Sequence, residues 1–186
     1  MTDTRRPRRP DVHELELVGG TEKRALEVVD YDEEWPGIFE QHRDRIRQAL
    51  RAADVAIEHI GSTSVPGLAA KPIVDILVVV DDITAEEDYL APLLGAGYLL
   101  RVREPGHRLV RTPERDVHVH VLGRGDEAVD KYLVFRNRLR VDAGDRALYA
   151  STKRALIGQF DDMNAYSDAK DEVVAAILAR AEAAGS

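Results

Sequence analysis

The stretch IEHIGSTSVPGLAAKPIVDILVVV, from Ile57 to Val80, carries the clearest structural pattern in this chain. Two strand-like apolar runs, 55–60 and 73–80, flank a loop rich in glycine, serine, threonine and proline. The second run is short and rich in β-branched residues, which favours a central strand covered on both faces over a helix. Alternation along that strand places Ile73, Asp75 and Leu77 on one face. The pattern therefore predicts an acid inside a buried strand.

Asp75 and the loop before it form a candidate binding site. An ionised carboxylate in a sheet core is costly unless it is paired or coordinates a metal ion. Gly61 has no Cβ to keep a phosphate away from the backbone, and three hydroxyls follow it, from Ser62, Thr63 and Ser64. The loop lacks the Walker pattern, so an ordinary turn is one alternative, and a carboxylate that caps the loop backbone is another.

Strand-like and helical patterns alternate along the rest of the chain. A helical apolar stripe includes Trp35, an expected core anchor, and should begin there because Pro36 is tolerated only in a first turn. Thr84 and Glu87 match a capping box, which predicts the start of a second helix. Further strands are expected over 23–31, 98–102, 107–111 and 117–122, and further helices over 126–140, 145–160 and 165–184.

These elements predict a single α+β domain over 23–186. It should hold a mixed β-sheet with flanking helices over 23–124, followed by a C-terminal helical half over 125–184. At least two of the last three strands should be antiparallel because their links are short. Residues 1–22 include four arginines interleaved with prolines, which predicts a disordered basic tail.

Composition excludes several classes of function. The net charge of −8 argues against a duplex nucleic acid as the main partner. No apolar run approaches the roughly 20 residues needed to cross a bilayer, so no membrane partner is expected. The chain has no cysteine, and no apolar segment follows the arginines as it would in an export signal. A cytoplasmic location is therefore the expectation, while the sequence leaves the oligomeric state open.

His118 and His120 are two residues apart on a predicted strand, so their side chains share a face. Two imidazoles with Asp75 as third ligand could hold a borderline metal such as Zn²⁺, Mn²⁺ or Ni²⁺. Hydrogen bonding to a phosphate or carboxylate is an equally weighted alternative, and a purely structural role is a third. His59, beside the loop, is more typical of a residue that orients the loop than of a ligand.

Basic side chains near these elements are candidate contacts for an anion. Lys71 is the strongest of them because it lies between the loop and Asp75 in the sequence. Most single lysines and arginines are simply solvated, so this interpretation competes with a surface role. The other candidates are Arg108, Lys131, Arg136, Lys153 and Lys170.

The motifs YDEEWPGIF, IEHIGSTSVPGLAAKPIVDILV, HVHV and FRNRLR, with late tyrosine and lysine pairs, resemble the GrpB family, also called UPF0157. The resemblance covers Leu26 to Leu178. It implies a nucleotidyltransferase fold like that of DNA polymerase β. In that superfamily a Gly-Ser loop precedes a strand with two acids, and a later strand supplies a third. The acids hold two Mg²⁺ ions that organise a nucleoside triphosphate.

The resemblance assigns roles position by position. Gly61 and Ser62 match the Gly-Ser element, and Asp75 matches the second acid. The first acid falls on Ile73, which cannot bind a metal. The third falls on His118 or His120. Arg136 and Lys153, with Tyr149, Tyr166 and Lys170, match recurrent polar positions of the family in the helical half.

The resemblance implies a cleft that binds a nucleotide or a phosphorylated small molecule with a divalent ion, Mg²⁺ or Mn²⁺, or Zn²⁺ or Ni²⁺ on the histidines. Asp75, His118 and His120 are the candidate catalytic and metal-binding residues. Gly61, Ser62, Thr63, Ser64, Lys71, Arg136 and Lys153 are the candidate nucleotide or phosphate contacts. Three functions stay open: nucleotidyl transfer to a small molecule, an accessory binding module such as the domains fused to dephospho-coenzyme A kinases, and a metal-dependent hydrolase or ligase.

Overall fold

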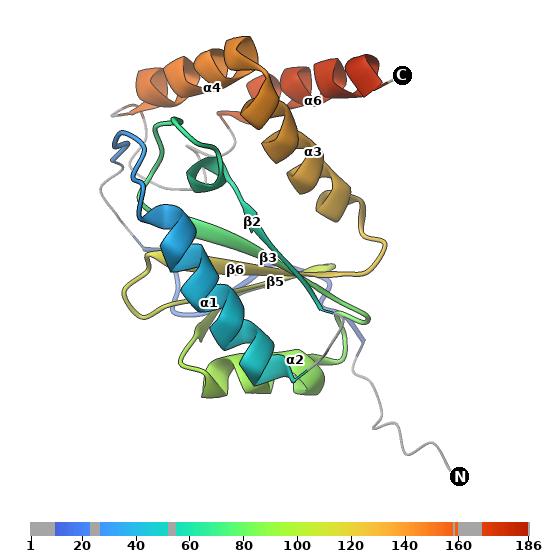
Figure 1. Cartoon of the computed structure of the whole chain (residues 1–186). Coiled ribbons are helices and arrows are strands. Elements are labelled where there is room, and N and C mark those ends of the chain that lie inside the picture. Colours follow the sequence, from blue (N-terminus) through green and yellow to red (C-terminus); the bar gives the residue numbers. More distant parts are fainter. Residues whose placement is uncertain (1–9, 23–26, 52–54, 158, 160–168, 186) are drawn as a thin grey trace.

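A six-stranded mixed sheet forms the middle of the molecule (Figure 1). The computed structural model describes residues 10–22, 27–51, 55–157, 159 and 169–185. The strands are β1 (Glu16–Leu17), β2 (Ala56–Ile60), β3 (Val74–Val80), β4 (Leu99–Glu104), β5 (His107–Arg111) and β6 (Val117–Gly123). Their order is β1-β4-β5-β6-β3-β2; β3 and β6 pair in parallel, and the other neighbours pair antiparallel.

Two helices cover one face of the sheet. α1 (Trp35–Leu50) and α2 (Glu86–Gly95) pack against the alternate apolar residues of β3 and β6 that point to this side, around Ile76 and Val119. Trp35 is buried in this core, and α1 begins at it, as expected. Burial on this face explains why the strands carry valine and isoleucine at every second position.

The C-terminal helices gather on the opposite side of the sheet (Figure 1). α3 (Glu127–Val141) packs Tyr132 and Leu133 against the other face of β3, around Leu77. α4 (Ala143–Leu156) and α6 (Asp171–Gly185) pack with α3 and with the loop that follows the short 3₁₀ helix η1 (Ser62–Ser64). The predicted α+β class, with a mixed sheet and a C-terminal helical half, is confirmed. Each helix in the described residues is too short or too polar to traverse a bilayer.

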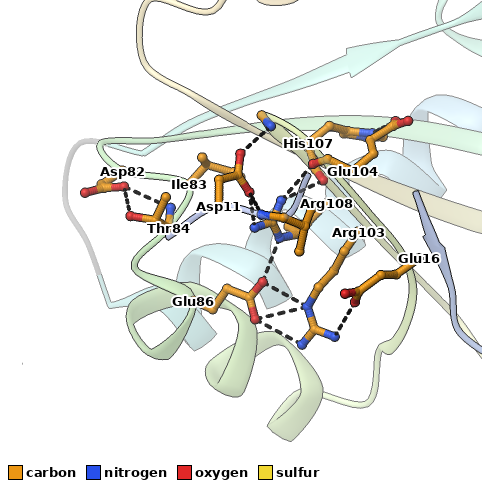
Figure 2. A network of polar contacts seen from close by, with 12 residues as sticks. Asp11, Glu16, Asp82, Ile83, Thr84, Glu86, Arg103, Glu104, His107 and Arg108 are labelled. Carbon is orange, nitrogen blue, oxygen red and sulfur yellow. Dashed lines mark hydrogen bonds and ion pairs between the residues drawn. The ribbon is translucent and has the colours of Figure 1, made fainter. Parts of the chain in front are cut away.

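The N-terminal segment from Pro10 to Glu22 lies on the sheet rather than in the disordered tail that we expected as far as residue 22. Glu16 and Leu17 pair with β4 as an edge strand. Asp11 Oδ1 lies 2.6 Å from Arg108 Nη2, and Asp11 Oδ2 accepts from the Gly106 amide at 2.7 Å (Figure 2). Acidic residues therefore attach this segment to the sheet; residues 1–9 lie outside the described residues.

Two further expectations differ from the structure. α2 begins at Glu86 instead of directly after Thr84, because the Thr84 amide and hydroxyl both donate to Asp82 Oδ1, at 2.8 and 2.6 Å. In the expected strand 23–31, Val29 makes an isolated bridge to Ala70, and residues 23–26 lie outside the described residues. The junction of the last two expected helices, 160–168, which includes Tyr166, also lies outside them.

Candidate functional site

The parallel pairing of β3 and β6 brings Asp75, His118 and His120 together on the α3 side of the sheet. Asp75 lies opposite His118, and Leu77 lies opposite His120. His120 Nε2 is 3.2 Å from Asp75 Oδ1, and His118 Nδ1 is 3.7 Å from the same oxygen. One candidate ligand atom from each residue lies within 4.8 Å of the other two. The three residues that the sequence singled out therefore form one cluster.

The chemistry of this cluster fits a single divalent ion. Ligand atoms around a tetrahedral zinc ion are about 3.4 Å apart, given metal–ligand bonds near 2.1 Å, so only small side-chain shifts are needed. One carboxylate with two imidazoles suits Zn²⁺, Mn²⁺ or Ni²⁺ better than Mg²⁺, which prefers oxygen ligands. A metal here would be held by Asp75, His118 and His120.

The surroundings of Asp75 keep it negatively charged. Burial by itself would raise the pKa of this carboxyl group. The hydrogen bond from His120 and the nearby charges of His120, His118 and His59 outweigh burial and hold the pKa below its ordinary value. The carboxylate is thus in the form that a cation requires.

Gly61 allows the loop to approach Asp75 closely. Its φ of +69° and ψ of −171° lie in a region essentially restricted to glycine. A Cβ at this position would lie 2.7 Å from Asp75 Oδ2. The glycine that the sequence proposed for close phosphate approach therefore also makes room for the Asp75 carboxylate.

The three loop hydroxyls have different surroundings. Ser62 lines the cavity beside Asp75. Thr63 Oγ1 lies 3.0 Å from His59 Nε2, and Ser64 Oγ donates to the Gly61 carbonyl at 2.6 Å. Thr63 and Ser64 are buried and are not among the described residues that line the cavity, so they brace the loop instead.

His59 also supports this loop, from the face of the sheet that α1 covers. Its ring stacks on Phe39 of α1, with centroids 4.9 Å apart, and it lies outside the described lining of the cavity. Burial lowers the pKa of His59 to about 4, so the ring is neutral at physiological pH. This placement agrees with the orienting role that the sequence favoured.

A cavity of about 300 Å³ joins the loop to the Asp75 cluster. Among the residues that the structure describes, its lining contains one carboxylate, Asp75, and the three lysines Lys71, Lys153 and Lys170. Ile73 lines it too, beside Asp75, as expected from the alternation of β3. The lysines exceed the carboxylate in number although the whole chain is acidic, so the lining favours an anionic ligand.

Lys153 is the most deeply buried of these lysines, with 2% of its surface exposed. Its Nζ donates to Ser62 Oγ at 2.9 Å and to the Ala69 carbonyl at 2.5 Å, and lies 4.7 Å from the centre of the Tyr149 ring. Burial, followed by the charge of Lys170, lowers the pKa of Lys153 to about 7. A bound anion would favour its protonated form.

Arg136 lies apart from this lining, although the sequence proposed it as a phosphate contact. Its Nη1 donates to Glu58 Oε2 at 2.7 Å and to the His59 carbonyl at 3.0 Å. Arg140 donates to the Ser64 carbonyl through Nε and Nη2, at 3.0 and 2.8 Å. These arginines of α3 therefore hold the end of β2 and the loop.

Sequence reasoning missed two aromatic rings next to the cluster. Tyr132 lines the cavity, and its ring centroid is 5.8 Å from that of His120; burial, with the charge of Asp75, raises its pKa to about 12. Tyr132 stands at helical spacing with the apolar residues of the predicted helix 126–140, a pattern that indicates core packing rather than a site. His107 stacks on His120 with centroids 5.2 Å apart. Alternation along each strand gives the face of a side chain, but the pairing of β5 with β6 is also needed to place His107 beside His120. That pairing cannot be read from the sequence pattern.

The fold is that of a nucleotidyltransferase. The structure resembles Cid1 poly(U) polymerase with MgGTP bound, with a TM-score of 0.50 and 15% identity, over 69% of this chain and 44% of that chain. At this identity the likeness establishes the fold alone.

The chain belongs to the GrpB family, as its motifs indicated. A family model described as GrpB protein matches residues 25–180. A UPF0157 protein of Streptomyces coelicolor is 63% identical over 185 residues, 99% of each chain. The crystal structure of the conserved protein GrpB from Enterococcus faecalis has a TM-score of 0.73 and 31% identity, over 83% of this chain and 96% of that chain. A dephospho-CoA kinase of Mycolicibacterium paratuberculosis is 27% identical over 80% of this chain, which is 44% of the kinase.

Proposed function

We propose that this protein binds a nucleoside triphosphate with a divalent metal ion and transfers the nucleotidyl group to a small-molecule acceptor. One observation carries the proposal: Asp75, His118 and His120 share a lysine-rich cavity with a Gly-Ser loop, within a nucleotidyltransferase fold. The volume, about 300 Å³, lies at the lower end of the range for small-molecule sites. This supports a small ligand rather than a nucleic acid strand.

Each lining residue has a distinct part in this proposal. The Gly61–Ser62 backbone and the Ser62 hydroxyl contact the β- and γ-phosphates, and Lys153 and Lys71 balance their charge. Asp75 and the two histidines hold the ion, which when bound neutralises phosphate charge at the reacting centre. The acceptor oxygen or nitrogen forms a bond to the α-phosphorus, pyrophosphate leaves with the electron pair of the broken P–O bond, and the acceptor proton passes to solvent.

Ile73 favours a second candidate function. It is buried beside Asp75, at the position where the superfamily resemblance expects another acid. A domain that kept the fold and the nucleotide cleft without the chemistry would be an accessory binding module. The similarity to part of a dephospho-CoA kinase supports this alternative.

A transfer assay separates the candidates. Each α-labelled nucleoside triphosphate is incubated with the protein, Mg²⁺ or Mn²⁺, and a filtered extract of small metabolites. We expect labelled adducts and pyrophosphate release that Asp75→Asn abolishes and that Asp81→Asn, an exposed acid outside the cleft, leaves unchanged. Tight nucleotide binding without adducts would support the accessory module. Hydrolysis that requires Zn²⁺ and both histidines would indicate the hydrolase or ligase.

Ile73→Asp tests the missing acid, with Ile73→Asn as a control of similar size. A second carboxylate beside Asp75 should add affinity for Mg²⁺, which prefers oxygen ligands. Equal Mg²⁺ affinity in both variants would argue against the alignment of Ile73 with the first acid.

A further inference from the structure

His120 lies in the middle of a line of four polar side chains that extends from the cleft to the β4–β5 turn. Its Nε2 faces Asp75 Oδ1 at 3.2 Å, and its Nδ1 lies 3.1 Å from His107 Nε2. His107 Nδ1 lies 2.5 Å from Glu104 Oε1. The four residues come from β3, β6, β5 and β4, so the line crosses the sheet.

The direction of these hydrogen bonds follows from the chemistry of the end group. A carboxylate oxygen only accepts hydrogen bonds, so His107 Nδ1 donates to Glu104. In a neutral imidazole the other nitrogen then carries the lone pair, so His107 Nε2 accepts from His120 Nδ1. Without a cation, the Nε2–H of His120 donates to Asp75, which as a carboxylate can only accept. With a cation at Nε2, the lone pair of that nitrogen is the ligand, and the hydrogen of His120 stays on Nδ1, donated to His107. That is the tautomer a metal ligand needs.

The hairpin that carries Glu104 and His107 is held rigidly. Pro105 and Gly106, with a Gly106 φ of +75°, make the two-residue turn that places Glu104 opposite His107. Arg108, 2% exposed, donates to the carbonyls of both Glu104 and His107, at 2.9 and 3.0 Å. Asp11 binds Arg108 and the Gly106 amide (Figure 2). The N-terminal segment therefore fixes the end of the line opposite the cleft.

We propose that His107, oriented by Glu104, is a positioning residue that fixes the ring of His120 with Nε2 toward the cleft. This role rests on the proposed metal site, which His107 itself does not enter. Outer partners of this kind typically change metal affinity by 10- to 100-fold.

Metal affinity is the first test, measured by calorimetry with Zn²⁺ and with Mn²⁺ on the full chain. His107→Phe keeps a flat ring against His120 but removes both nitrogens, and should weaken binding about 10- to 100-fold. His107→Gln restores an acceptor and should recover most of the affinity. His42→Phe is the matched control, because His42 Nδ1 also makes one hydrogen bond, 2.7 Å to Tyr98 Oη, away from the cleft. Full affinity in His107→Phe, or an equal loss in His42→Phe, would overturn the proposal.

The second test needs no metal. Nitrogen-15 spectra of the imidazoles in the metal-free protein report which nitrogen of His120 bears the hydrogen. We expect a hydrogen on Nδ1, donated to His107, in the wild type, and a hydrogen only on Nε2, facing Asp75, in His107→Phe. A wild-type His120 with no hydrogen on Nδ1 overturns the positioning role even if metal binds. If the wild type binds neither ion, the proposed function fails, and this spectrum alone decides the role of His107.

Discussion

Two polar clusters of this molecule differ in how their charges are balanced. The outer network joins Asp11, Glu16 and Glu86 to Arg103 and Arg108 between α2, β4, β5 and the N-terminal segment (Figure 2). Its central arginine, Arg108, is buried, and it contacts two carboxylates and two carbonyls. The cleft around Asp75 instead has three lysines for one carboxylate in its described lining.

The difference distinguishes polar side chains that stabilise the fold from polar side chains that could bind a ligand. A buried charge that is fully paired stabilises one arrangement of the chain, and removing one partner leaves the others uncompensated. A cavity with an excess of cations gains from a ligand of opposite charge. We therefore expect variants of the outer network to lose stability, and variants of the cleft to lose binding.

The largest expected effect is on stability, in the outer network. Arg108→Leu leaves Asp11 and Glu86 without their shared partner and should lower the free energy of unfolding by about 3 kcal/mol in urea denaturation. The control Arg124→Leu, in an exposed ion pair with Asp81, should cost less than about 1 kcal/mol. Affinity of the folded Arg108→Leu protein for pyrophosphate without metal, which depends on the loop and the lysines, should stay within threefold of the wild type. Equal losses of stability in the two variants would show that the buried Arg108 matters no more to the fold than the exposed Arg124.

Gly61→Ala should lower both the stability of the fold and the affinity of the cleft for a metal ion. Its Cβ would collide with the Asp75 carboxylate in a backbone region that alanine rarely adopts, so we expect a loss of about 2 kcal/mol and of metal binding. Gly67→Ala is the matched control, since Gly67 has a φ of +75° but a Cβ added there would meet no atom within 4 Å; it should cost about 1 kcal/mol and keep the site. Metal binding retained in Gly61→Ala would contradict the proposed contact between loop and acid.

Lys153 should make anion binding depend on pH. Its pKa near 7 means that the free protein loses this positive charge as pH rises above 7, so affinity for a phosphate should fall on the alkaline side. The ratio of wild-type to Lys153→Met affinity for pyrophosphate should decrease tenfold or more between pH 6 and pH 9. This comparison cancels the titration of pyrophosphate itself. A ratio that stays constant would show that Lys153 only holds Ser62 and Ala69.

The smallest effect is expected at Arg136. Its contacts to Glu58 and the His59 carbonyl lie outside the cavity, so Arg136→Lys should change pyrophosphate affinity by less than threefold. Calorimetry at fixed ionic strength measures this directly. A loss of affinity as large as that of Lys153→Met would indicate that Arg136 contacts the ligand, as the sequence predicted.

The sequence predicted the part of the site that depends on local periodicity. Alternation placed His118 with His120, and Ile73 with Asp75, and the glycine-rich loop marked the backbone turn. It could not predict which hydroxyls face the cavity, because Thr63 and Ser64 are turned inward by partners fixed only in three dimensions. The fold class followed from the order of strands and helices. The line from Glu104 to His120 depends on strand register, which no local pattern supplies.

The proposed function requires that the Asp75 cleft binds a nucleoside triphosphate through a metal ion. Calorimetric titration of the full chain with a non-hydrolysable ATP analogue, with and without Mn²⁺, tests it most directly. We expect binding that requires Mn²⁺ and becomes at least 100-fold weaker in Asp75→Asn, because one of three ligands is lost. Binding of the analogue that is equally tight without metal, or unchanged in Asp75→Asn, would show that the cleft does not hold a triphosphate through a metal ion.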